Sequence, residues 1–311
     1  MKTVAANKKM HPLLKSLIHQ RETWLLCLPI IIWALIFCYY PMYGLLMAFV
    51  NYAPGREIWQ CDWVGLKYFS KFVLGSDFPR LLRNTLAMSG LSITVGFICP
   101  ILFAFMLNEI GNIRIKKFIQ TASYLPHFIS WVVAGAMITQ LLATDGVLND
   151  FLIHTGLIEK RISFLQKGEW YWGIYTIANI WKGLGWSTII YLSAISSVDE
   201  ELYQVGSIDG MGRLRMAIHI TLPAILPTII LLWIMGIGGI LSAGFDQHLI
   251  IGNPITQKYW DVIDTYSYRY GVQQGYYSMG TAVSMMKSIV GFLMVLITNA
   301  IARKVSDVAL F

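Results

Sequence analysis

The chain has 311 residues, of which 56% are hydrophobic and 13% are charged, and its mean hydropathy is +0.57. A soluble domain of this composition would have too little polar surface to stay dissolved, so we expect a membrane protein. The net charge of +7 does not indicate nucleic-acid binding, because the basic residues flank apolar stretches and form no basic module interleaved with aromatic residues.

The first apolar stretch begins at Trp24 and follows a basic segment, as in a secretory signal peptide. It is too long for a signal peptide, and bulky Tyr and Pro residues stand where a cleavage site needs small ones. We therefore expect it to be retained as a first membrane span over residues 24–48, with kinks at Pro29 and Pro41.

Five further stretches reach the roughly 20 apolar residues that a helix needs to cross a bilayer. They cover residues 84–107, 119–143, 171–195, 224–245 and 278–302. Pro100 interrupts the first of them and Pro126 lies near the start of the next, which neighbouring groups can accommodate. The sequence thus predicts an all-α polytopic membrane protein with six transmembrane helices in one domain.

An even number of spans places both termini on the same side of the membrane. That side would carry twelve Lys and Arg residues and the opposite loops ten. The opposite loops are longer, and basic residues in short loops weigh most, so we expect both termini to be cytoplasmic. The expected parts are a cytoplasmic segment over 1–23, the membrane domain over 24–302 and a cytoplasmic tail over 303–311.

A polar stretch at about residues 196–223 separates the fourth and fifth expected spans. Ser196 or Ser197 would cap a short helix with an acidic first turn. Gly210 and the nearby Gly212 favour a sharp reversal, after which a second amphipathic piece would lead to Pro223 at the start of the fifth span. The apolar edge of the first helix would consist of Leu202, Val205 and Ile208.

Three motifs in this stretch resemble the coupling loop of binding-protein-dependent ABC permeases, whose pattern runs E-L-Y-E-A-A, then I-D-G, then I-T-L-P. The matching motifs are Glu201-Leu202-Tyr203, Ile208-Asp209-Gly210 and Ile220-Thr221-Leu222-Pro223. Gln204-Val205-Gly206 replaces E-A-A, so a salt bridge made by a Glu at position 204 is not expected. Segments starting at Thr121, Asn179 and Asp261 resemble the branch that imports oligosaccharides or polysaccharide fragments.

The resemblance implies a type I ABC importer permease fold in a bacterial plasma membrane. The ATPase-coupling residues would be Glu201, Leu202, Tyr203, Gln204, Gly206, Asp209, Gly210 and Pro223. The implied partners are a second homologous permease subunit, two ATPase subunits that bind ATP and Mg²⁺, and an extracellular solute-binding lipoprotein. This chain would hold no cofactor of its own. Without the resemblance, an amphipathic helix lying on lipid would explain the stretch equally well.

The fourth span carries the clearest candidates for a solute pathway. Asn179, Lys182, Gly183 and Trp186 fall at i, i+3, i+4 and i+7, hence on one helical face. Trp can stack on a sugar ring, Asn and Lys can hydrogen-bond its hydroxyls, and the resemblance places a sugar site here. In the alternative interpretation Lys182 snorkels or pairs with an acid such as Asp246, and Trp186 only packs.

The fifth span is rich in small residues, which favour close helix packing. Its Ser242 and the following Asp246 are further pathway candidates, whereas Lys287 in the sixth span is expected to be paired or to lie near an interface. The external loops contain many aromatic residues, which suit either an interfacial belt or the docking of a binding protein.

The chain has no P-loop, no metal-binding motif and no converging catalytic set. Its four cysteines form no C-x-x-C, and its six histidines are isolated in sequence. We therefore expect a transport subunit rather than an enzyme, importing an oligosaccharide. The alternatives are a permease for a non-sugar solute, a stand-alone secondary transporter with repeated halves, or a membrane enzyme.

Overall fold

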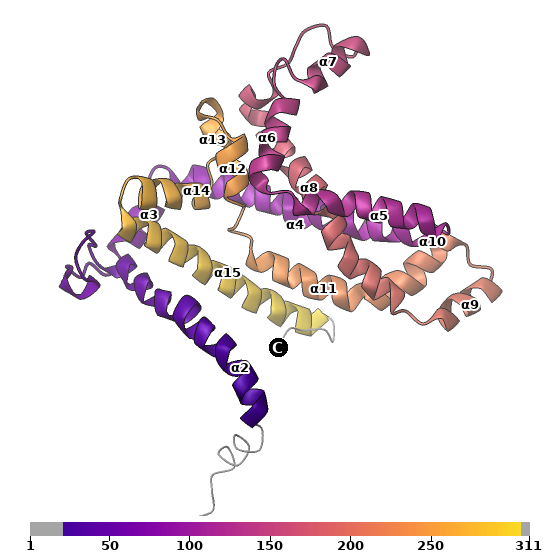
Figure 1. The fold of residues 1–311 in the computed structure, drawn as a ribbon, viewed down its shortest axis with the longest axis horizontal. Coiled ribbons are helices and arrows are strands. Elements are labelled where there is room, and N and C mark those ends of the chain that lie inside the picture. The colour runs from indigo at the N-terminus through magenta and orange to yellow at the C-terminus, as the bar shows by residue number, and fades with distance from the viewer. Residues whose placement is uncertain (1–20, 306–311) are drawn as a thin grey trace, which may run out of the picture.

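The computed structural model describes residues 21–305, so most of the expected segment 1–23 and of the tail 303–311 lies outside the described residues. Within this range the ordered elements are helices, apart from an isolated β-bridge between Val50 and Trp63. The long helices form an elongated bundle with α9 at one end and α3 and α14 at the other, while α6 and α7 project from its side (Figure 1). The α-helices are α2 (Arg21–Ala34), α3 (Lys67–Val73), α4 (Phe78–Asn108), α5 (Ile113–Phe128), α6 (Trp131–Leu141), α7 (Val147–His154), α8 (Tyr171–Ser196), α9 (Glu200–Ile208), α10 (Arg213–Met216), α11 (Leu222–Gly238), α12 (Asp246–Ile251), α13 (Gln257–Trp260), α14 (Ile263–Tyr268) and α15 (Tyr277–Val305). The π- and 3₁₀-helical segments are η1 (Leu35–Tyr39), η2 (Tyr40–Phe49), η3 (Ile58–Gln60), η4 (Phe164–Gln166), η5 (Gly168–Trp170), η6 (Ala217–Thr221), η7 (Pro254–Thr256) and η8 (Arg269–Gln273).

Among the described residues, four helical segments are long and apolar enough to cross a membrane, and a fifth results if α5 and α6 form one bent span. The four are Glu22–Phe49, Phe78–Asn108, Arg213–Gly238 and Tyr277–Lys304. The fourth predicted span corresponds to α8, whose 26 residues reach about 39 Å. That length suffices for a bilayer, but α8 is too polar to count among the four.

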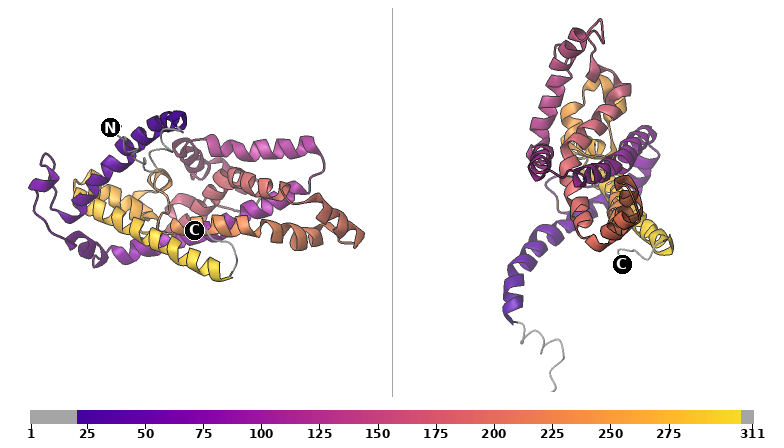
Figure 2. Two further views of the ribbon diagram at one scale, coloured as in Figure 1. Left: turned by 90° about the horizontal axis from the view of Figure 1, so that it is seen from below. Right: turned by 90° about the vertical axis from the view of Figure 1, so that its right-hand side faces the viewer.

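The first span, Glu22–Phe49, is helical throughout but changes type along its length. Pro29 lies inside α2, and the π-helical η1 gives way to the 3₁₀-helical η2 next to Pro41, which has no N–H to donate. The span extends away from the rest of the bundle (Figure 2). Most of its side chains are exposed in the single chain, as expected of a helix that lipid or a partner subunit surrounds.

The prediction of one continuous third span over 119–143 is wrong. α5 ends at Phe128, α6 begins at Trp131, and the two helices are bent by 102°. Ile129 has an extended backbone, and Ser130 caps α6 by accepting a hydrogen bond from the Val133 N–H at 3.3 Å. A new helix start directly after α5 therefore turns the chain at this point.

The fifth span begins at Arg213 rather than at residue 224 and ends at Gly238 rather than at residue 245. α10, η6 and α11 are continuous, so the prediction of a separate amphipathic piece before the span is wrong. The Leu222 N–H bonds to the Ala217 carbonyl, five residues back, immediately before Pro223. This π turn allows the helix to continue through a residue that has no N–H of its own.

α8 lies at the centre of the bundle, where it contacts α4, α5 and α11. Three buried apolar clusters follow one another along α4, at Ala104 and Leu107, at Met88, and at Leu81. α11 approaches α15 so closely that a Cβ on Gly291 would lie 2.5 Å from the Gly238 carbonyl oxygen. The close packing predicted from the small residues of the fifth span is confirmed at Gly238.

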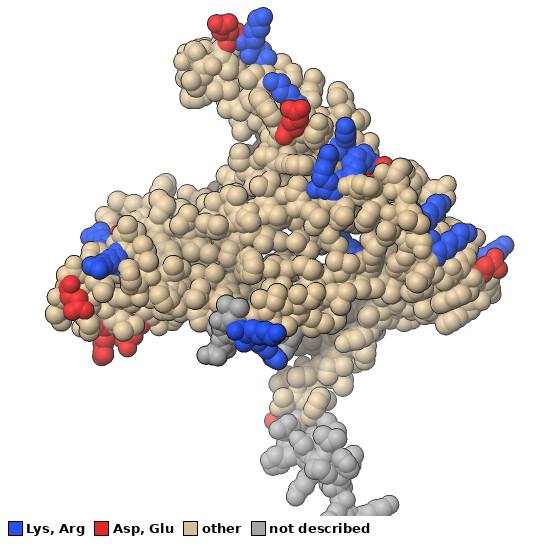
Figure 3. All heavy atoms as spheres, turned by 180° about the vertical axis from the view of Figure 1, so that it is seen from behind, with Lys and Arg blue, Asp and Glu red and all other residues tan. Residues whose placement is uncertain are grey.

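Charged side chains gather at both ends of the bundle, on the projecting arm and near its base, and in a basic patch at the lower edge, with broad uncharged surface elsewhere (Figure 3). At the end that contains α9, Arg213 and Glu109 form an ion pair at 3.8 Å. The link between α4 and α5 therefore lies beside the polar stretch 196–223. These two connections, which the sequence places on the same side of the membrane, meet at one end of the molecule.

Candidate functional site

The polar stretch begins with an acidic cap on α9. Asp199 Oδ1 accepts a hydrogen bond from the Glu201 N–H at 3.0 Å, which stabilises the amino end of the helix. The prediction that Ser196 or Ser197 is the cap is wrong, because α8 continues to Ser196. Both serine hydroxyls instead donate to carbonyls in the last turns of α8.

Gly210 closes α9 with the reversal that the sequence predicts. Its φ of +71° lies in the left-handed region. Its N–H bonds to the Ser207 carbonyl at 3.1 Å, and the Met211 N–H bonds to the Gly206 carbonyl at 2.9 Å, which together form a Schellman motif. Gly212 has a φ of −72° that any residue can adopt, so Gly210 alone requires a glycine here.

α9 packs against the start of the fifth span. Gly206 is buried, and a Cβ at this position would lie 2.9 Å from Ile220 Cδ1. The Tyr203 and Thr221 hydroxyls are 2.8 Å apart. Because η6 continues into α11 without a break, these contacts join α9 directly to a membrane-spanning helix.

The opposite side of α9 is an exposed apolar ridge, formed by Leu202, Val205 and Ile208. These side chains are 49%, 57% and 85% exposed. The remaining predicted coupling residues, Glu201, Gln204, Asp209 and Pro223, are exposed as well. The predicted set is therefore divided between an inner face that packs on the bundle and an outer ridge that a partner surface can bind.

Asn179 and Gly183, two of the predicted pathway residues of α8, line a cavity of about 200 Å³ between α8 and α4. Ser92 and Gly96 contribute the α4 side of this cavity. A Cβ at Gly183 would meet nothing within 4 Å, so the backbone is open to a ligand. The Asn179 side chain donates to the Tyr175 carbonyl at 3.0 Å, which leaves its amide close to the helix.

Lys182 and Trp186 reach a different neighbour, the bend between α5 and α6. The Lys182 ammonium donates to the His127 carbonyl at 2.8 Å and lies 5.5 Å from the ring centroid of Trp131. The Trp186 ring stacks on the His127 imidazole, with centroids 4.5 Å apart and 3° between the planes. A pairing of Lys182 with Asp246 is not found, and Trp186 stays 47% exposed.

Ser242 and Asp246 lie beyond the fifth span, in the turn that leads into α12 and at its first residue. Both are exposed, and neither belongs to the lining of the cavity at Asn179. The adjacent Gln247 reaches α8, where its amide donates to Asn179 Oδ1 at 3.4 Å. Of the predicted pathway residues, Asn179 is thus connected to α12 through Gln247, which the sequence analysis did not include in the pathway.

A buried histidine anchors α12 to α8. His248 Nε2 lies 2.9 Å from the Ala243 carbonyl, which can only accept, so this nitrogen carries the proton. Nδ1 then accepts from the Tyr171 hydroxyl at 2.8 Å, and the Tyr175 ring stacks on the imidazole at 4.6 Å. Burial lowers the pKa of His248 from 6.5 to about 4. The histidine is therefore neutral at physiological pH.

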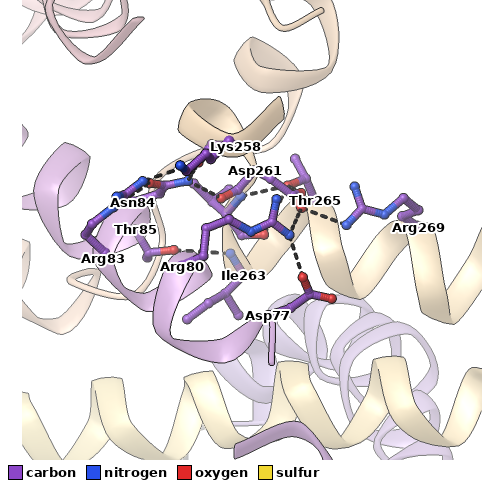
Figure 4. Close-up of polar contacts among 11 residues, drawn as sticks. Asp77, Arg80, Arg83, Asn84, Thr85, Lys258, Asp261, Ile263, Thr265 and Arg269 are labelled. Carbon is purple, nitrogen blue, oxygen red and sulfur yellow. Dashed lines mark hydrogen bonds and ion pairs between the residues drawn. The ribbon is translucent and has the colours of Figure 1, made fainter. Parts of the chain in front are cut away.

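A buried carboxylate, Asp261, joins the start of α4 to the segment around α14 and η8, at the end opposite α9 (Figure 4). Its Oδ2 accepts from Arg269 at 2.7 Å and pairs with Arg80 at 3.5 Å, and its Oδ1 accepts from Thr265 at 2.8 Å. Asn84 donates to the Asp261 backbone carbonyl at 2.9 Å. The sequence analysis counted the two arginines only among the basic residues of the opposite loops, since spacing alone does not reveal a contact between α4 and a segment far along the chain.

Lys287 of α15 is paired with Asp264 of α14, which confirms that it is paired within the protein. Next to this pair lies a second cavity, of about 400 Å³, between α14, η8 and α15. Its lining includes the aromatic pair Phe245 and Tyr268 and the hydroxyl of Ser267. The ion pair therefore joins α15 to α14.

Comparisons with known proteins agree with this arrangement. Residues 92–307 match the family model described as "Binding-protein-dependent transport system inner membrane component". The chain is 41% identical to Protein LplB of Bacillus subtilis over 94% of this chain and 92% of that protein. It is 40% identical to the polygalacturonan/rhamnogalacturonan transport system permease protein YteP of the same organism, over 98% and 94%.

Two solved structures are also similar, both of a bacterial alginate ABC transporter. One, described as importing the acidic polysaccharide alginate, has a TM-score of 0.87 at 39% identity and covers 95% of this chain and all of its own. The other, in complex with an alginate pentasaccharide-bound periplasmic protein, has a TM-score of 0.88 at 38% identity over 96% of this chain. The chain belongs to the family of binding-protein-dependent inner membrane components and is a multi-pass permease subunit of an ABC importer, a transport component rather than an enzyme.

Proposed function

We propose that this permease subunit imports an oligosaccharide and is driven through α9 by separate ATPase subunits. The observation that carries the proposal is the construction of α9. One face is fixed to the fifth span through Gly206 and Tyr203, and the other presents an exposed apolar ridge at one end of the bundle. A helix seated in a groove of an ATPase would pass rigid-body motion directly to α11.

The proposed topology has six spans with both termini in the cytoplasm. The bent pair α5 and α6 serves as the third span and α8 as the fourth, because neighbouring helices shield its polar groups from lipid. α9 and the link between α4 and α5 then lie at the cytoplasmic end, and the Asp261 network lies outside. In this orientation the basic residues of the short connections are cytoplasmic, as the positive-inside rule requires.

The proposed pathway follows α8, where Asn179 and Gly183 open onto one cavity and Trp186 offers an exposed ring. Flat aromatic rings and amide groups are suited to the apolar faces and the hydroxyls of sugar rings. A second permease subunit would complete the cavity, and ATP and Mg²⁺ would bind only in the ATPase subunits. The exposed aromatic residues Trp59 and Trp63, which are 74% and 66% exposed, are candidates for contact with the extracellular binding protein.

The relatives support an oligosaccharide as the solute. YteP is described as a polygalacturonan/rhamnogalacturonan permease, and more distant relatives are described as permeases for arabinooligosaccharides and lactose. The similar structures import alginate. We therefore propose a sugar chain of a few residues, delivered by a binding protein, as the transported solute.

The test is the ATPase activity of the reconstituted complex, measured with and without a loaded binding protein across a panel of oligosaccharides. Stimulation by one class of sugar is the expected result. ATP-independent uptake by this chain alone would support a secondary transporter instead. Stimulation only by a non-sugar solute would retain the permease and overturn the proposed solute class.

A further inference from the structure

Lys182 is a buried cation that has no acidic partner within residues 21–305. Of the described side chains, Lys182 and Asp261 are the two charged ones that are buried, with 9% and 0% exposure. Asp261 is neutralised by two arginines. No described carboxylate lies within 4.0 Å of the Lys182 ammonium, whose hydrogen bond is to the uncharged His127 carbonyl.

A buried charge is costly unless it is paired, and an ionisable residue within a membrane normally has a partner. His127 lies in the last turn of α5, whose end carries a charge of about −0.5 from the helix dipole. This end, together with the Trp131 ring 5.5 Å from the ammonium, compensates only part of the full positive charge. An ammonium has three donors, of which the His127 carbonyl takes one, so further acceptors fit this position.

Lys182 does not itself line the cavity, but two residues of the proposed pathway lie next to it on α8. Gly183, its neighbour in the chain, lines the cavity between α4 and α8, and Trp186 lies one helical turn away with its ring half exposed. A solute that stacks on Trp186 and contacts the open backbone at Gly183 brings its substituents close to Lys182. The missing counter-ion can therefore arrive with the solute.

We propose that Lys182 binds a carboxylate of the transported sugar, so that the subunit selects oligosaccharides with acidic, uronate-type residues. This inference rests on the proposed oligosaccharide function and specifies its substrate class. A single ammonium suits a carboxylate, which carries one charge.

The rival explanation is structural, in which Lys182 merely caps the carbonyl end of α5. The two explanations differ in their dependence on the charge of the solute. A capping role affects acidic and neutral sugars alike, whereas a carboxylate-binding role affects only acidic ones. The charge of the solute must therefore be varied together with the charge of residue 182.

The experiment measures ATP-driven uptake by the whole reconstituted complex with trigalacturonate and with the same trisaccharide after reduction of its carboxyl groups. The binding protein is kept saturated with each sugar, and its loading is verified separately. Wild type is expected to favour the acidic sugar by about 10-fold to 100-fold in kcat/KM, the range for a hydrogen bond to a charged group. Lys182→Gln should reduce this preference to about 1, and Lys182→Arg should retain most of it.

The matched control is Lys167→Gln, which removes a lysine that lies over the Trp170 ring in an external loop and should leave the preference unchanged. Equal losses for both sugars in Lys182→Gln would show a structural cap and overturn the inference. A wild type that transports both sugars equally would overturn it as well. If neither sugar nor any other oligosaccharide were transported, the proposed function itself would fail.

Discussion

The most informative substitution in the coupling region is Gly210→Val. Gly210 adopts a φ of +71°, and a Cβ there would meet nothing within 4 Å. The energetic cost of the substitution therefore comes from backbone strain and not from a steric clash. An L-residue in the left-handed region costs about 1–2 kcal/mol, and a β-branched one more. A cost of this size shifts the equilibrium between a closed and a frayed end of α9 by a factor of about 5 to 30.

The assay measures sugar uptake and ATP hydrolysis in the same proteoliposomes, and the expected result is a lower ratio of sugar to ATP. Gly212→Val is the matched control, since Gly212 has a φ of −72° and also has open space around it. Gly210→Asn should restore coupling, because Asn tolerates left-handed backbone. If Gly210→Val and Gly212→Val had the same coupling ratio, the Schellman turn would not matter for coupling.

Three further predictions concern the pathway and stability. Trp186→Ala should lower kcat/KM for sugar uptake without affecting assembly of the complex, whereas Trp186→Phe should retain most of the uptake activity. Unchanged uptake in both variants would contradict stacking of the Trp186 ring on the solute. Lys287→Met leaves the half-buried Asp264 unpaired and should lower the free energy of unfolding by about 1–2 kcal/mol, measured as a lower Tm in detergent. Arg161→Met, which breaks a more exposed ion pair, should change it by less than about 1 kcal/mol. Equal effects of the two variants would contradict this prediction. Because the pKa of His248 is lowered to about 4, the neutral histidine contributes roughly 3 kcal/mol to the free energy of unfolding. This contribution is complete above pH 6.5 and is lost as the pH falls towards 4. A His248→Gln variant whose Tm had the same pH dependence as wild type would refute this prediction.

Local signals in the sequence predicted the parts of the fold that depend on local chemistry. The apolar stretch at 278–302 became α15, and the glycine of the I-D-G motif became the left-handed turn at Gly210. Both follow from properties of single residues or of one uninterrupted segment. Most of the predicted coupling residues fall together on α9 and its closing turn for the same reason, since their motif is contiguous.

The errors occurred where the outcome depends on competing or distant partners. Ser196 and Ser197 resembled helix caps, but their hydroxyls bond to carbonyls of α8, and Asp199 caps α9 instead. The third stretch had enough apolar residues for one span, yet Ser130 starts a new helix there. The hydrogen bond from Lys182 to the His127 carbonyl joins residues far apart in the chain, which helical spacing cannot reveal.

The same limit explains why the Asp261 network and the His248 anchor were missed. Asp261 stands before the apolar pair Val262 and Ile263, which is the one local sign that it is buried. Its arginine partners come from α4 and η8, and His248 pairs with Tyr171 of α8. Such clusters follow from tertiary packing, which brings polar groups together to satisfy one another in the interior.

The central claim, that α9 docks on an ATPase at the cytoplasmic end, is tested most directly by site-specific cross-linking. A cysteine replaces Ile208, which is 85% exposed on the ridge, in a chain whose four native cysteines are substituted. The same replacement at Trp59, which is 74% exposed in the loop before α3 at the opposite end, serves as the control. The account predicts that the cysteine at 208 cross-links to the ATPase subunit and the cysteine at 59 does not. A cross-link from position 59 to the ATPase, or labelling of position 208 from outside the cell, would contradict it.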